Sequence, residues 1–189
     1  MRADSDISLF TTGRPLPLTG AERTLLGEFF GAGLDPDVVR VRDGGVPSWL
    51  CTRSVFGTIF FQAAICFPEK RATPWGRGLL VHETVHVWQY RTVGARYAAG
   101  ALWDQLRYAL ATGTRRGAYL YDLERARPLV TYGFEQQAQI LQDHYLHTRE
   151  GDGASLWRHC RNVEALGEGE ARAIAAEHRA HVTGGGAAR

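Results

Sequence analysis

Two histidines with a glutamate between them have the residue types and the spacing of a metal site. His82 and His86 lie four positions apart in the segment HETVH. If this segment is helical, both imidazoles project from one face, one turn apart, and can reach the same ion. Glu83 would then lie beside the ion, where its carboxylate can accept a proton from water. The pattern therefore predicts Zn²⁺ bound by His82 and His86, with Glu83 as the general base.

The residues around this segment favour a buried helix. Val85 and Trp88 can cover its other faces, and we expect a helix over residues 76–91, with Gly94 ending it. A carboxylate such as that of Glu83 is costly in so apolar a helix unless it is paired or lies near a metal ion. A chance pair of core histidines therefore explains the segment less well than a metal site does.

A catalytic zinc site takes three protein ligands and leaves one position for water, so a later residue must complete the set. Enzymes that take a third histidine six positions after the second need glycine at position 89 and histidine at position 92, where this chain has Gln89 and Thr92. Glu135 fits best, because it lies in the first turn of a helix expected over residues 131–149, where a carboxylate stays ionised. The alternative for Glu135 is a solvated acid that complements the helix dipole.

Other side chains remain open as ligands, and we rank them after Glu135. Two histidine pairs have a spacing of three, one on the helix at 131–149 and one on a last helix expected at 163–181. Histidines on polar helix faces are more often solvated than metal-bound, and aspartates are better suited to orienting a histidine ring. These candidates are His144, His147, His178, His181, Asp143 and Asp122.

The length and the charge of the chain limit its organisation and its partners. The 189 residues suit one domain, and we expect an arm at 1–18, a domain at 19–182 and a disordered tail at 183–189. The net charge of +2 gives no case for nucleic acid or an anionic membrane as a partner. No segment approaches the roughly 20 apolar residues that cross a bilayer.

The expected location follows from two further features. The polar N-terminus has no signal-peptide core, and the three scattered cysteines do not form a disulfide framework. We therefore expect a cytoplasmic protein with reduced thiols, which a specialised secretion system can still export.

The remaining patterns predict an α+β fold that is mostly helical, with a small N-terminal sheet. Thr19 and Glu22 predict a capping box for a short helix that ends at Gly31. A proline-bracketed loop at 68–74 leads to the histidine helix, which packs against the helix bearing Glu135. Strands are expected at 38–42, 49–51 and 57–61, and further helices at 95–111, 131–149 and 163–181.

Taken together, these residues resemble a known group of enzymes. HETVH followed by Glu135 on a later helix resembles the gluzincin branch of the zinc metallopeptidases. The segments LVHETVHVWQY, YDL and FEQQA are similar to small bacterial Vgr-related or Rhs-associated zinc peptidases of contractile or type VI secretion systems. The similarity runs from Leu18 to Tyr145. It implies a zincin-like fold, Zn²⁺ bound by His82, His86 and Glu135, a peptide or protein substrate, and a secretion-apparatus protein as partner.

One position departs from the gluzincin pattern. Four residues after the ligand glutamate, those enzymes often have an aspartate that bonds the first histidine, whereas this chain has Gln139. The amide oxygen of Gln139 can accept the same imidazole proton, but with less charge. No motif assigns the side chain that stabilises the oxyanion, for which Tyr132 and Tyr121 are candidates.

Two functions follow, and the sequence leaves both open. The first is a zinc metallopeptidase in which Glu83 is the general base, and this includes a toxin that acts only in a target cell. The second is a non-catalytic adaptor or structural component of a secretion apparatus, in which the metal stabilises the fold. Gln139 and the small size of the chain favour the second function.

Overall fold

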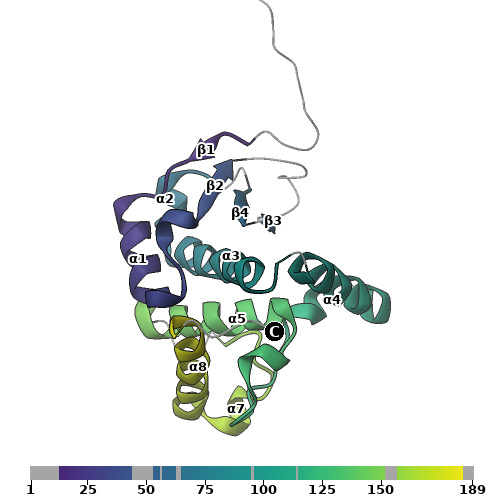
Figure 1. Cartoon of the computed structure of the whole chain (residues 1–189). Helices are drawn as coiled ribbons and strands as arrows, with labels where there is room; N and C mark the ends of the chain where they lie inside the picture. The colour runs from purple at the N-terminus through teal and green to yellow at the C-terminus, as the bar shows by residue number, and fades with distance from the viewer. Residues whose placement is uncertain are drawn as a thin grey trace, which may run out of the picture.

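One small sheet and a set of helices build the fold, which confirms the predicted α+β class. The computed structural model describes residues 13–43, 53–55, 57–62, 65–94, 96–113, 115–151 and 157–184. Figure 1 shows the sheet on one side of the long helix α3 (Pro74–Val93) and the helix α5 (Phe134–Tyr145) on the other side. The strands are β1 (Pro15–Leu16), β2 (Arg40–Asp43), β3 (Arg53–Val55) and β4 (Thr58–Phe61).

The sheet has the order β1-β2-β4-β3, with β2 and β4 parallel and each outer strand antiparallel to its neighbour. Val41, Ile59 and Phe61 are buried, so one face of the sheet belongs to the core. β1 lies within the segment that we expected to be an arm, and it pairs with β2 through Pro15 and Leu16.

The expected strands are only partly confirmed. The strand at 57–61 is β4, but the strand expected at 38–42 begins at Arg40. Pro36 starts a 3₁₀ turn, η2 (Pro36–Val38), whose N-cap is Asp35, and this turn delays the strand. The strand expected at 49–51 lies outside the described residues.

The first helix has the predicted capping box. The Thr19 side chain accepts a hydrogen bond from the Glu22 backbone N (3.2 Å), and the Glu22 carboxylate accepts one from the Thr19 N (2.7 Å). The helix, α1 (Gly20–Phe30), ends at Gly31, whose φ of 53° suits glycine. A short 3₁₀ turn, η1 (Gly31–Gly33), follows.

The segment expected as a loop at 68–74 contains a short helix, α2 (Pro68–Arg71). Pro68 occupies its first turn, where the missing N–H costs nothing. The guanidinium of Arg71 is buried and lies 2.6 Å from the Glu22 carboxylate. This ion pair joins α2 to α1.

The two helices that follow confirm the predictions at 76–91 and 95–111. Thr73 caps α3 by accepting a hydrogen bond from the Gly76 N (3.1 Å), and Gly94 ends it with a φ of 66°. The next helix is α4 (Arg96–Thr112), followed by the 3₁₀ turn η3 (Arg115–Tyr119). None of the helices in the described part of the chain is both long and apolar enough to span a membrane.

The helix expected at 131–149 consists of three elements. A 3₁₀ turn, η4 (Leu129–Thr131), precedes α5, and a π-helical turn, η5 (Leu146–Glu150), follows it. The predicted start at residue 131 was wrong, because α5 begins at Phe134. Gly133 is its N-cap, and the N–H of Gly133 donates to the Gln136 side chain (3.0 Å).

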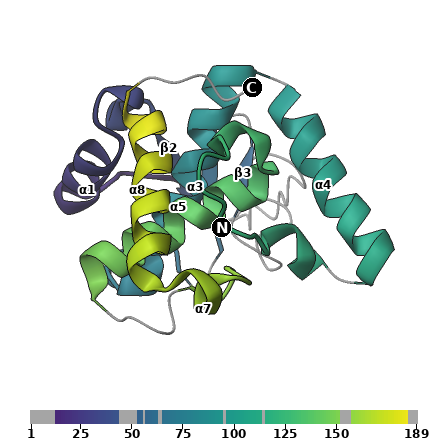
Figure 2. The same ribbon diagram turned by 90° about the horizontal axis from the view of Figure 1, so that it is seen from below.

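The helix expected at 163–181 is broken into α7 (Val163–Leu166) and α8 (Glu168–Thr183). Gly167, with a φ of 80°, ends the first and begins the second, which the periodicity did not reveal. Arg179 of α8 donates hydrogen bonds to the carbonyl oxygens of Phe29 (3.0 Å) and Glu28 (2.6 Å). In Figure 2, α8 crosses α5 and lies beside α1.

Candidate metal centre

The two histidines of the motif lie one turn apart on α3, as the sequence predicts. Their ring centroids are 4.9 Å apart, and His82 and His86 are only 5% and 4% exposed. Leu80, Val81 and Val85 of the same helix are fully buried, so packing on several sides holds α3 in place. The helix therefore presents both imidazoles from a fixed backbone.

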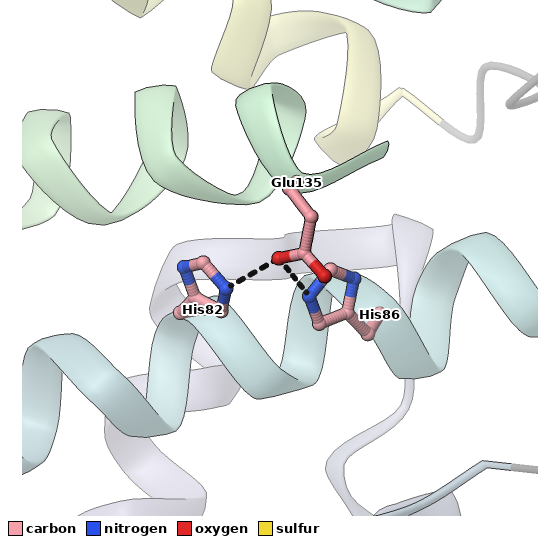
Figure 3. Close-up of side chains that lie close together, drawn as sticks. All are labelled: His82, His86 and Glu135. Atoms are coloured by element: carbon pink, nitrogen blue, oxygen red, sulfur yellow. Dashed lines mark ion pairs between the residues drawn. The ribbon is translucent and has the colours of Figure 1, made fainter. Parts of the chain in front are cut away.

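Glu135 of α5 completes the cluster. Its Oε2 lies 3.4 Å from the Nε2 of His82 and 3.3 Å from the Nε2 of His86, as Figure 3 shows. One donor atom from each of the three side chains lies within 4.8 Å of the others. Within the described ranges, this is the only group of three or more histidine, cysteine or acidic side chains with such spacing. The contact between α3 and α5 thus brings together residues that are about 50 positions apart.

The electrostatics of the cluster keep the carboxylate ionised. Burial alone would raise the pKa of Glu135, but the neighbouring imidazoles of His86 and His82 bring it well below its usual value. Burial would lower the pKa of His86, but the carboxylate of Glu135 raises it to about 9. Each group therefore stabilises the charged form of the other, and Glu135 is in the ionised form in which a carboxylate binds metal.

The donor set fits a zinc ion. Two imidazole nitrogens and one carboxylate oxygen are a ligand set that catalytic zinc sites use. All three donors are buried and converge on one point between α3 and α5.

Glu83 lies next to His82 and is also buried, with 4% exposure. Its Oε2 has no hydrogen-bond partner among the residues that the structure describes. Burial raises the pKa of its carboxyl group, because the charged form is poorly solvated there. The backbone oxygen of Glu83 accepts a hydrogen bond from the Ser54 hydroxyl of β3 (2.8 Å), which links the edge of the sheet to the motif.

Gln89 supports His86, a role that the sequence analysis missed. The Oε1 of Gln89 lies 2.8 Å from the Nδ1 of His86. The amide nitrogen of Gln89 donates to the backbone oxygen of Phe134 (3.0 Å) and to the Oε1 of Gln137 (3.0 Å). The available signal was its position three residues after His86, on the same helix face.

The expected bond between Gln139 and the first histidine is not formed. The amide of Gln139 instead donates to the Oδ1 of Asp143 (2.8 Å). The Nδ1 of His82 has no hydrogen-bond partner in the described part of the chain. The other oxygen of Asp143 accepts a hydrogen bond from the Tyr121 hydroxyl (2.7 Å). Asp143 and Tyr121 thus belong to a separate buried network.

The histidines ranked after Glu135 are not brought to the cluster. His144, His147 and His178 are buried, so the expectation that they are solvated was wrong. The ring of His144 lies near that of Phe29, and the Nδ1 of His147 accepts a hydrogen bond from Trp157 (3.2 Å). These side chains fill the space around α5 and α8. The two other candidates are also engaged elsewhere: His181 lies by Trp88, and Asp122 pairs with Arg161.

Two tyrosines that the sequence analysis did not consider lie beside the histidines. The ring centroid of Tyr97 is 5.4 Å from that of His86, and the centroid of Tyr119 is 6.0 Å from that of His82. Burial, together with the carboxylates of Glu135 and Glu83, raises the pKa of Tyr97, so its hydroxyl remains a hydrogen-bond donor.

The two tyrosines named from the sequence have structural partners instead. The Tyr132 hydroxyl donates to the backbone oxygen of Asp122 (3.1 Å), and Tyr121 bonds Asp143.

Comparisons with known proteins relate the chain to a bacterial secretion protein. No family model matches the chain. In a comparison of 147 aligned positions that covers 73% of the chain, it is 29% identical to the type VI secretion system spike protein VgrG2b of Pseudomonas aeruginosa. The match spans only 14% of the length of that protein. The solved effector domain of the same VgrG2b has a TM-score of 0.63 and 26% identity, over 87% of this chain and 83% of that one. The chain is therefore similar to one domain of a much longer Vgr protein.

Proposed function

We propose that this chain is a zinc-dependent hydrolase of peptide bonds that acts as an effector module of a type VI secretion system. One observation carries the hydrolase proposal. The donors of His82, His86 and Glu135 converge within 4.8 Å, and Glu83 beside them has a buried carboxylate oxygen without a partner in the described residues. A purely structural ion needs its ligands but has no use for that additional carboxylate.

The roles of the side chains follow from their positions. A zinc ion bound by this cluster would lower the pKa of a water molecule to about 7 and polarise the substrate carbonyl. Glu83 accepts the proton of the attacking water and later returns it to the leaving nitrogen. His82, His86 and Glu135 hold their places because α3 and α5 pack around them.

Tyr97 is the residue that we propose for stabilising the oxyanion. Its hydroxyl stays protonated beside the carboxylates of Glu135 and Glu83, and its ring packs near His86. A hydrogen bond from such a donor strengthens as negative charge develops on the substrate oxygen. Tyr97 is 5% exposed, so water competes little for this bond.

The substrate class is proposed from the sheet. β3 is the last strand of the described sheet, and Ser54 ties it to the backbone of Glu83. An extended peptide can add to such an edge as a further strand, with its main chain held by regular hydrogen bonds. This arrangement would lay a peptide bond beside the motif and favours a peptide or an unfolded protein segment as substrate.

The link to secretion is proposed from the similarity to VgrG2b. The related domain is described as an effector and belongs to a type VI spike protein. Because the match covers 83% of that domain, an effector role with the same secretion machinery is the simplest assignment for this chain.

The experiment is a comparison of the parent with Glu83→Gln. We expect about one zinc per chain in both proteins by elemental analysis, since Gln keeps the shape of the side chain. Hydrolysis of a mixed peptide library, followed by mass spectrometry, should fall about 100-fold or more in the variant, because Gln is not a base. A chelator should abolish hydrolysis by the parent. A variant that cleaves as fast as the parent would show that Glu83 is not the general base.

A metal-stabilised adaptor is the second candidate function. The observation that favours it is burial, since the three side chains of the cluster and that of Glu83 are each only 4–5% exposed. This function predicts bound zinc, a marked loss of thermal stability with chelator, and no cleavage by the parent of any peptide in the library. The same preparations therefore distinguish the two functions.

A further inference from the structure

The outer face of α4 carries a stripe of exposed apolar side chains. Trp103, Leu106 and Leu110 are 64%, 46% and 79% exposed. Their spacing of three and seven places them on one side of the helix. Large apolar side chains that gather in this way mark an interaction surface, whereas scattered ones do not.

The opposite face of α4 packs against the interior of the domain. Tyr97 and Ala101 are buried, and Tyr97 packs edge-on against Phe134 of α5 (5.4 Å between centroids). At Gly100, a Cβ atom would lie only 2.4 Å from the ring of Phe134. The helix therefore cannot rotate to bury its stripe without losing this close packing.

The sequence around the stripe is rich in arginine. Between residues 91 and 117 the chain has five arginines and one acid, Asp104, a net charge of +4. Since the whole chain has a net charge of +2, the rest of the molecule carries −2. The arginines are Arg91, Arg96, Arg107, Arg115 and Arg116.

Two of these arginines lie on the same helix face as the stripe. Arg96 and Arg107 are exposed. They are seven positions before and four positions after Trp103, which places each within about 40° of it around the helix. A partner that covers the stripe therefore meets two arginines at its border, where negative charge is favourable.

We propose that this face of α4 docks on an anionic lipid surface, with Trp103, Leu106 and Leu110 entering the interface and the arginines contacting lipid phosphates. An apolar stripe with tryptophan and leucine beside arginines is the pattern of helices that lie in a membrane interface. α4 lies at the edge of the molecule opposite α1 and α8, as Figures 1 and 2 both show. The bulk of the domain is therefore turned away from a surface that this helix touches.

A second copy of the chain fits this face poorly. Two such segments would bring a charge of +4 against another +4, and like charges across an interface are unfavourable. A lipid surface supplies both the apolar layer and the negative groups, and it needs no groove shaped to the helix. The inference does not depend on the proposed hydrolase, because none of these side chains belongs to the metal cluster.

The experiment is cosedimentation of the full chain with vesicles. One set is pure phosphatidylcholine, and the other contains roughly 30% phosphatidylglycerol to supply negative charge. The test variants are Trp103→Gln/Leu106→Gln/Leu110→Gln and Arg96→Gln/Arg107→Gln. The matched control is Phe67→Gln/Trp75→Gln, which removes two aromatic side chains that are each 55% exposed but lie outside α4. Circular dichroism and gel filtration report the fold and the oligomeric state of each protein.

We expect the parent and the control to bind the anionic vesicles alike, and binding to fall strongly at about 0.5 M salt. The double arginine variant should bind about 30-fold more weakly, because each arginine near such a surface contributes about fivefold. The triple variant should lose about 100-fold or more.

Four results would overturn the proposal. These are equal binding to neutral and anionic vesicles, no binding to either, an equal loss in the control, and a dimer in gel filtration that only the triple variant dissociates. The last result would assign the face to a second copy. No binding to either kind of vesicle would indicate that this face of α4 docks in an acidic groove of a partner protein instead.

Discussion

The Nδ1 of His86 lies 2.8 Å from the Oε1 of Gln89, and the same glutamine holds the start of α5 through the backbone oxygen of Phe134. Phe134 directly precedes Glu135. One uncharged side chain therefore orients a histidine of the cluster and also fixes the backbone next to the carboxylate. Because the amide oxygen accepts, His86 donates to it through Nδ1, which directs Nε2 towards Glu135.

Replacing Gln89 with leucine should weaken metal binding without unfolding the protein. Gln89→Leu keeps a similar volume but removes all three hydrogen bonds. Loss of such a supporting partner typically lowers metal affinity 10–100-fold, and we expect a decrease of about this size in competition titrations with a zinc chelator. Thr92→Val is the control, since the Thr92 hydroxyl donates to the backbone oxygen of Trp88 within its own helix. Equal affinities for Gln89→Leu and the parent would mean that the glutamine does not support the ligand.

Removal of the Glu135 carboxylate should abolish stoichiometric zinc binding. Glu135→Ala deletes one donor of the cluster, so we expect the affinity to fall by more than about 100-fold, beyond the effect of a supporting residue. Elemental analysis after gel filtration gives the zinc content. The control is His144→Ala, which should keep about one zinc per chain, because His144 lies near Phe29 and not at the cluster. Zinc retained by Glu135→Ala and lost by His144→Ala would identify His144, and not Glu135, as the third ligand.

Acid should destabilise the fold through two histidines between α5 and α8. Burial, followed by nearby positive charge, lowers the pKa of His144 and of His178 to about 4. Both are neutral in the folded protein, while the unfolded chain takes up protons below its ordinary pKa of about 6.5. The stability is therefore complete above pH 6.5 and is lost as the pH falls towards 4, by an amount of the order of 3 kcal/mol for each histidine.

This pH dependence can be measured by urea unfolding at pH 7, 6 and 5 with a chelator present, so that release of metal does not contribute. The double variant His144→Gln/His178→Gln should lose most of the slope between pH 6.5 and 5. A slope in the double variant as steep as that of the parent would assign the acid sensitivity to other groups.

Breaking the buried ion pair between α1 and α2 should cost much more than breaking an exposed pair. Glu22→Gln leaves the guanidinium of Arg71 buried without a counter-ion, and such losses cost about 3–5 kcal/mol. Asp37→Asn removes the partner of Arg23 in an exposed pair, where we expect about 0–1 kcal/mol. Urea unfolding of both variants at pH 7 gives the comparison. Similar losses in the two variants would contradict the importance of burial.

The grouping of His82, His86 and Glu135 was largely predictable because its signals are local. The spacing of His82 and His86 acts within one helical turn, and Glu135 was recognisable from its place in the first turn of an apolar helix. The predicted trio is the one that the structure brings together. The supporting contacts were predictable only in part. The place of Gln89 three residues after His86 was a local signal on one helix. The bonds of Gln89 to Phe134 and Gln137, and the place of Tyr97 beside His86, depend on how three helices pack, and the period of one helix does not record that.

The same limit explains the errors in the fold. His144, His147 and His178 were expected in solvent because their spacing suggested polar helix faces, but all three are buried, His147 beside Trp157. The break at Gly167 was missed because apolar positions continue on both sides of it.

The hydrogen bonds from Arg179 to Phe29 and Glu28 join positions 150 and 151 residues apart. Contacts of such separation form late, because nearly the whole chain must be ordered before they can close. During synthesis, α1 emerges long before α8, so its aromatic face stays uncovered until α8 has been made. The folding of this domain is thus coupled to the synthesis of α8, and a shortened product ending before α8 would be exposed to proteolysis and aggregation.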